Sequence, residues 1–262
     1  MNNTARTNRM FYVLVGVLGL ALMLSPARAT NSSEQQNMSS SPRPTATTDT
    51  ISAKQQTIAP IAAAMATGDM ARLNAALNQG LDAGLTISEA KEILVQLYAY
   101  TGFPRSLNAL GELKTVVDAR QRHGIHDEPG RGPSHPVPTG EALLVAGAAN
   151  QSRISGGPVK SPVFDFAPVI NQFLQAHLFG DIFERDNLDW ISRELATIGA
   201  LAAMSGVEPQ LRSHVAASIR VGLTVPQLRQ LAQVLATHGD ANAGERLSQA
   251  LDRYLSDSAG KK

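Results

Sequence analysis

A histidine and a glutamate in the C-terminal half of the chain have side chains suited to proton transfer. His214 follows Pro209 in a segment with apolar residues at helical spacing, and Glu194 lies in the preceding segment of this kind. If the two helices pack antiparallel, the carboxylate can orient the imidazole, which exchanges protons near neutral pH. The pair is a candidate for general acid and base catalysis. A buried contact that merely joins two helices is the structural alternative.

Two arginines lie close to this pair in the sequence. Arg193 and Arg212 carry guanidinium groups, which match a carboxylate through two parallel hydrogen bonds. We therefore expect them as substrate-binding residues. For Arg212 a surface ion pair with Glu208 or Asp189 is the favoured interpretation.

A histidine-rich segment near the middle of the chain contains donor types that bind metals. They are His123, His126, Asp127, Glu128 and His135. Gly124 and Pro129 interrupt any helical spacing between them, so neighbouring donors need not converge on one point. The pattern favours a solvated loop, and we predict neither a metal site nor a cofactor.

The chain contains an internal repeat with an offset of 138 residues. Gly84-Leu85-Thr86 recurs as Gly222-Leu223-Thr224. In each copy a glycine ends one helix and a threonine caps the next, with Glu89 or Gln227 three residues later to complete a capping box. Two copies of an all-helical unit are therefore predicted. At this offset Gln56 and Ala76 occupy the positions of Glu194 and His214, so the first copy is predicted to be chemically silent.

These patterns divide the chain into five segments. They are a signal peptide at 1–29, a disordered linker at 30–55, a first repeat at 56–123, a Gly/Pro/His-rich connector at 124–163 and a second repeat at 164–257. One short helix is expected at 141–149 within the connector, and one or two at 164–183. A longer helix is expected at 187–204 with Asp186 as its N-cap.

The first residues have the order of a secretory signal. Arg6 and Arg9 precede an apolar run at 11–24, and the small-x-small site Ala27-Arg28-Ala29 follows. The run is shorter than the ~20 residues of a membrane-spanning helix. We expect cleavage after Ala29 and a periplasmic or secreted product with no membrane partner.

Charge and cysteine content exclude two function classes. Removal of 1–29 takes three arginines from the 23 Lys and Arg, which leaves 20 against 22 Asp and Glu and a net charge of −2. With no basic run elsewhere, nucleic-acid binding is not expected. The chain has no cysteine, so thiol chemistry is excluded.

Several motifs together resemble the carboxymuconolactone decarboxylase family. They are Gly84-Leu85-Thr86 through Glu89 and Glu92, the turn Tyr98-Ala99-Tyr100-Thr101-Gly102-Phe103-Pro104, Arg193-Glu194-Leu195, Leu211-Arg212-Ser213-His214-Val215 and Gly222-Leu223-Thr224. The resemblance covers nearly all of Gln56 to Leu251 and implies tandem repeats of the alkyl hydroperoxidase D-like fold, often assembled into oligomers. We expect a homo-oligomer here.

The family includes two activities. The alkyl hydroperoxidase D-like branch uses a Cys-x-x-Cys pair before the family histidine, and these positions are Val207 and Gln210 in this chain. A thiol peroxidase is therefore rejected. The decarboxylase branch, a lyase, needs neither thiol nor cofactor, so the resemblance leaves this chemistry open with His214 and Glu194 as its catalytic residues.

Three further residues are expected near the substrate. The resemblance places the turn with Tyr98 and Tyr100 near the pocket, and His177 lies in a block that is similar to tandem relatives. Packing is the alternative role for each. The leading hypothesis is a decarboxylase-type enzyme acting on a small carboxylated or lactone-like molecule of unknown identity. A non-catalytic helical scaffold or small-molecule binding protein is the second hypothesis.

Overall fold

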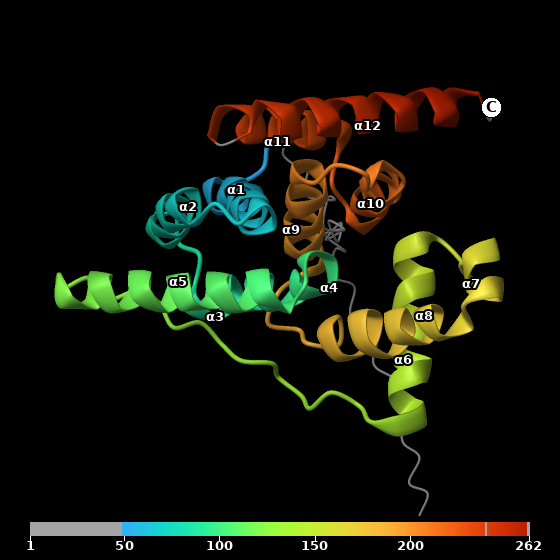
Figure 1. Cartoon of the computed structure of the whole chain (residues 1–262), viewed down its shortest axis with the longest axis horizontal. Coiled ribbons are helices and arrows are strands. Elements are labelled where there is room, and N and C mark those ends of the chain that lie inside the picture. Colours follow the sequence, from blue (N-terminus) through green and yellow to red (C-terminus); the bar gives the residue numbers. More distant parts are fainter. Residues whose placement is uncertain (1–48, 239, 261–262) are drawn as a thin grey trace, which may run out of the picture. The chain divides into compact units, whose positions relative to one another are not determined.

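The described residues of the chain are entirely free of strands. A computed structural model describes residues 49–238 and 240–260 (Figure 1). The first part contains α1 (Ala53–Thr67), α2 (Met70–Asp82), α3 (Ile87–Gln96), α4 (Tyr98–Thr101) and α5 (Phe103–Arg122). The connector and the segment after it contain α6 (Gly140–Ser155), α7 (Pro162–Phe166), α8 (Pro168–Phe173) and the π-helix η1 (Leu174–Ile182). The last part contains α9 (Trp190–Ala203), α10 (Glu208–Val221), α11 (Val225–His238) and α12 (Ala241–Ala259). The all-α prediction is confirmed.

The helices reproduce the repeat seen in the sequence. The starts of α1, α2, α3 and α5 precede those of α9, α10, α11 and α12 by 138 residues, within one residue. The two repeats join where α1 packs against α9 (Figure 1). Their backbones approach closely there, because a Cβ atom on Gly199 would lie 2.6 Å from the carbonyl oxygen of Ala59.

The predicted capping boxes are present in both repeats. The hydroxyl of Thr86 accepts from the backbone of Glu89 at 3.2 Å, and the Glu89 carboxylate accepts from the backbone of Thr86 at 2.9 Å. Thr224 and Gln227 exchange the same two bonds at 3.3 and 2.9 Å. Each box satisfies two backbone donors that the first turn of a helix leaves unpaired.

Other helix boundaries differ from the prediction. The cap of α9 is Asp189, whose carboxylate accepts from the backbone of Ser192 at 2.9 Å. Asp186 instead accepts hydrogen bonds from Ser134 and Arg131 in the connector. At the other end of the chain, α1 begins three residues before the predicted start of the first repeat. The predicted signal peptide lies outside the described residues.

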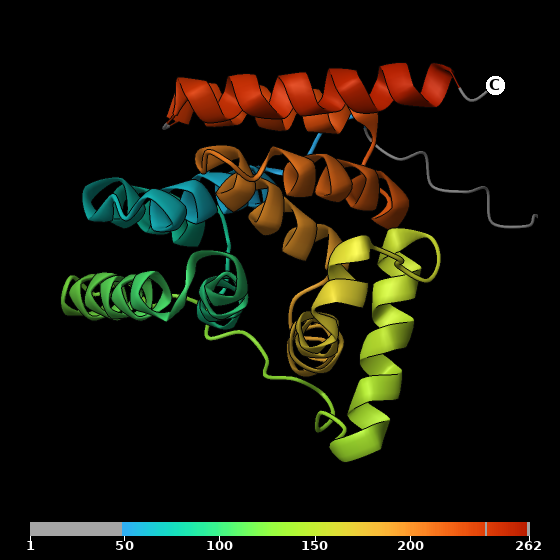
Figure 2. The same cartoon turned by 45° about the vertical axis from the view of Figure 1, so that its right-hand side comes forward.

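More of the connector is helical than the sequence predicts. In place of a helix at 141–149, α6 runs for 16 residues and packs against η1 (Figure 2). The contact requires a glycine, since a side chain on Gly147 would overlap the backbone carbonyl of Gln175. Along 49–238 and 240–260, no helix has the length and apolar character needed to cross a membrane.

Candidate active site

The structure brings Glu194 and His214 together. Nδ1 of His214 lies 2.8 Å from Oε2 of Glu194, where α9 and α10 pack against each other. The Glu194 side chain is 0% exposed and the His214 side chain is 16% exposed. The carboxylate is therefore held in the core, while the imidazole keeps one edge accessible.

The burial of Glu194 is not fully compensated by hydrogen bonds. Its second oxygen, Oε1, is buried and has no hydrogen-bond partner within the described part of the chain. A buried charge of this kind is costly unless it is paired, and its one described partner is His214. The carboxylate is thus positioned to orient the imidazole.

Tyr100 brings the first repeat into the same site. Its ring meets the His214 ring edge-on, with 5.6 Å between the ring centroids. Its hydroxyl is buried, and Thr197 is the polar side chain that faces it. Burial raises the pKa of this hydroxyl and the negative charge of Glu194 raises it further, while Thr197 and Arg193 oppose the shift. The phenol therefore stays neutral beside the carboxylate.

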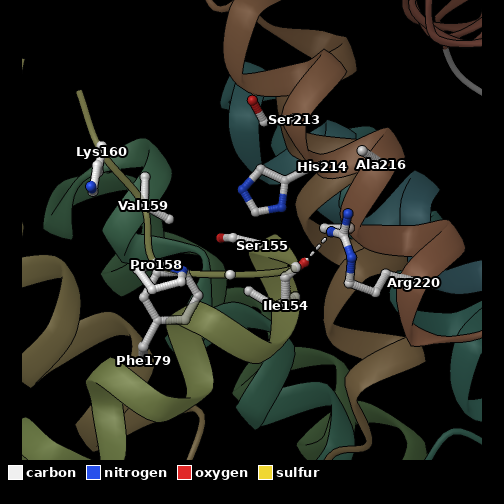
Figure 3. A pocket seen from close by; sticks show the side chains of 13 residues that line it. Ile154, Ser155, Pro158, Val159, Lys160, Phe179, Ser213, His214, Ala216 and Arg220 are labelled. Atoms are coloured by element: carbon white, nitrogen blue, oxygen red, sulfur yellow. Dashed lines mark hydrogen bonds between the residues drawn. The ribbon is translucent and has the colours of Figure 1, made fainter. Parts of the chain in front are cut away.

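His214 lines a cavity of about 510 Å³. One wall is the segment from Ile154 to Lys160 at the end of α6, and Phe179 of η1 lies beside it. The opposite wall is α10, with Ser213, His214, Ala216, Ala217 and Arg220 (Figure 3). Alanines next to the imidazole leave room for a small molecule, and the volume falls within the usual range of ligand pockets.

Two cationic side chains in this cavity were missed by the sequence analysis. Arg220 donates to the backbone carbonyl of Ile154 at 2.6 Å, and Lys160 extends from the opposite wall (Figure 3). Helical spacing carries a usable signal for Arg220, because Ser213, Ala217 and Arg220 follow an i, i+4, i+7 pattern on one face. No comparable signal exists for Lys160, which lies in a loop.

Arg193 occupies the core rather than the cavity. It is 0% exposed, and its guanidinium donates to the side chain of Gln96 at 2.9 Å and to Glu92 at 3.1 Å. Arg185 also binds Glu92, at 2.9 Å. Burial alone would raise the pKa of Glu92, but the hydrogen bonds from Arg185 and the charge of Arg193 lower it. Arg193 therefore links the two repeats and does not line the cavity.

The remaining predicted substrate contacts do not line the cavity. Arg212 is exposed on α10 and makes no ion pair with Glu208, Asp189 or another of the described residues. His177 pairs with Asp181 at 2.6 Å. Tyr98 lies 5.3 Å from the His177 ring and stacks on Phe103. Tyr98, Phe103 and His177 thus form an aromatic group at η1 that does not line the cavity.

The histidine-rich segment is partly anchored by an ion pair. Asp127 accepts from Arg120 through both oxygens, at 2.8 to 3.0 Å, and these hydrogen bonds raise the pKa of the Arg120 guanidinium. Asp127 is thereby engaged with α5. Within the described ranges, no group of three potential metal ligands is close enough to hold an ion.

Comparison with known proteins identifies both repeats. The model of the carboxymuconolactone decarboxylase family matches residues 45–115 and 168–252. The two matched segments coincide with the two repeats and leave out most of the connector. Among curated proteins, none matches the chain.

Proposed function

Because this chain belongs to the carboxymuconolactone decarboxylase family, we propose that it is a cofactor-independent enzyme using His214 for proton transfer. The observation that carries the proposal is the contact between His214 and Glu194 at the wall of a 510 Å³ cavity. The substrate would be a small carboxylated or lactone-like molecule. The signal-like sequence at 1–29 supports action in the periplasm or outside the cell.

The charges around the cavity favour an anionic substrate. Arg220 and Lys160 contribute positive charge on either side of His214, and a guanidinium suits a carboxylate especially well. These two residues take the binding role that the sequence suggested for Arg193 and Arg212. Arg193 has no place in this proposal because its guanidinium is enclosed by the core.

Proton transfer follows from the way the imidazole is held. Nδ1 of His214 is hydrogen-bonded to Glu194, so Nε2 of His214 is the nitrogen that contacts the substrate. In a decarboxylation the bond to the carboxylate breaks, carbon dioxide leaves, and the electron pair remains on carbon. Protonated His214 supplies the proton to that carbon, and Glu194 stabilises the imidazolium before the transfer.

A thiol mechanism is excluded by composition. Val207 and Gln210 stand at the cysteine positions of the peroxidase branch, and no cysteine occurs anywhere in the 262 residues. Peroxide reduction by thiolate attack therefore has no nucleophile in this chain.

The proposal is tested by measuring the turnover of a panel of carboxylated lactones. The release of carbon dioxide reports the reaction. We expect His214→Ala to lower kcat by about 10²-fold or more, the usual range for general acid catalysis. Arg220→Gln should mainly raise KM. Arg212→Gln, an exposed arginine on the same helix, is the matched control and should leave both constants unchanged.

A non-catalytic binding protein remains the second candidate. It is supported by the first repeat, which has the same order of helices although Gln56 and Ala76 stand at the positions of Glu194 and His214. Under this hypothesis, panel members that raise the melting temperature are not turned over, and His214→Ala lowers their affinity alone. That combination would replace the enzyme proposal with the binding one.

A further inference from the structure

Two apolar surfaces in the described part of the chain have no partner. The first, which we call the ridge, lies on α7 and α8. It consists of Val163, Phe166, Val169, Ile170 and Phe173. Phe166 is 91% exposed and Phe173 is 61% exposed, unusual values for phenylalanines at successive turns of two short helices.

The second surface, which we call the groove, lies between α3 and α5. It has a volume of about 460 Å³, and its lining consists of Ile87, Leu110, Leu113, Val117, Lys91 and Lys114. Four of these side chains are aliphatic and the two others are cationic. The groove is thus an apolar channel with positive charge along its edge.

The second repeat shows that the groove is not required by the fold. The equivalents of Lys91 and Lys114 are Arg229 and Asp252, which form an ion pair at 2.8 Å between α11 and α12. In the first repeat two like charges stand at these positions. Lys114 pairs along its own helix with Asp118, and no ion pair joins α3 to α5 at the groove.

Charge and apolar character make the two surfaces complementary to each other. Asp165 is the sole charged residue from Pro162 to Phe173, so the ridge is apolar with one negative charge. Pairing ridge with ridge would bring two Asp165 carboxylates together, and pairing groove with groove would bring lysines together. Pairing ridge with groove matches opposite charges and buries the aromatic side chains.

We propose that the ridge of one copy of this chain binds in the groove of a second copy. The ridge side chains expose roughly 500 Å² of apolar surface, comparable with the apolar part of an interface of about 800 Å² per partner. The contact joins different surfaces of the two copies, so repetition of it builds a ring or an open chain. The proposal is independent of the catalytic role of His214.

The test uses two variants, each damaged on one surface. Phe166→Lys with Phe173→Lys alters the ridge, and Leu110→Lys with Val117→Lys alters the groove. Light scattering after gel filtration should give assemblies for the unmodified protein and monomers for each variant alone. Mixing the variants should restore a one-to-one dimer, because one contributes an intact groove and the other an intact ridge.

Circular dichroism and melting temperature verify that each variant is folded. As a control, Leu107→Lys changes an exposed site on α5 outside the groove and should leave assembly unchanged.

A charge exchange sharpens the test. Lys91→Glu should weaken association at least about tenfold, and adding Asp165→Lys should restore it. The proposal is overturned if the unmodified protein is monomeric at tens of micromolar. It is also overturned if the groove variant assembles alone or the mixture remains monomeric. None of these readouts depends on activity.

Discussion

The two repeats place different residues at equivalent positions of one scaffold. Glu194 and His214 of the second repeat and Tyr100 of the first repeat converge beside a cavity of about 510 Å³. Their counterparts are Gln56, Ala76 and His238, and Ala76 and His238 line a cavity of about 10 Å³. That volume is about the size of one water probe, so the position is effectively filled.

The difference arises from the connector as well as from substitution. The segment from Ile154 to Lys160 and Phe179 supply one wall of the large cavity, and they precede the second repeat. No element among the described residues precedes α1 in the same way. The two copies of the helical unit thus differ in two ways: the second has the contact between Glu194 and His214, and it has an additional wall from the connector.

The largest effect on stability is expected from replacement of Glu92, a position that holds a different residue in the second repeat. Glu92→Ala leaves the guanidinium of Arg193 buried without its carboxylate, which should cost about 3–5 kcal/mol of unfolding free energy. The equivalent residue of the second repeat is Gln230, and Gln230→Ala should cost much less. Urea unfolding measures both. Equal losses would show that the buried ion pair does not distinguish the repeats.

Replacement of Glu194 should separate activity from stability. Glu194→Gln removes the charge that orients His214, so we expect kcat to fall about 10- to 100-fold. Stability should stay the same or rise, since a buried carboxylate with an unpaired oxygen is lost. Gln56→Glu is the control in the silent repeat. A loss of stability with full activity would instead favour a structural role for the pair.

Acid pH offers a smaller effect with a defined sign. The pKa of Glu92 is lowered in the folded protein, so its contribution to stability is present above its ordinary pKa of 4.5 and is lost as the pH falls through the folded value. Below pH 4.5 the unfolding free energy of the unmodified protein should therefore fall more steeply than that of Glu92→Gln. Parallel slopes in acid would exclude Glu92 as the responsible group.

The smallest expected effect is on the turnover of a protein in which the His–Glu pair is moved to the first repeat. Gln56→Glu with Ala76→His rebuilds the pair in the first repeat, yet the surrounding space of about 10 Å³ admits no substrate. In a His214→Ala background these changes should restore no turnover. Measurable turnover would show that the pair alone, without the wall from the connector, suffices.

Sequence patterns predicted local features well. The predicted caps at Thr86 and Thr224 and the predicted contact between Glu194 and His214 agree with the structure. The predicted cap at Asp186 is wrong, because Asp189 caps α9. Both aspartates precede the same apolar stripe, and the carboxylate three residues before Ser192 is the one that reaches its backbone N–H. Hydrogen bonding of Asp186 to the connector is a long-range contact that spacing does not reveal.

The amino-acid sequence by itself determined the helical class, the duplication, the lack of a thiol nucleophile and the asymmetry between the repeats, because these depend on residue identity and on interactions within a few residues. The tertiary structure decided which arginine faces the cavity, since Arg193 and Arg220 carry the same group and differ only in what packs around them. It also decided where the cavity and the groove lie. Burial depends on which helix faces meet, and those contacts join residues that are far apart in the chain.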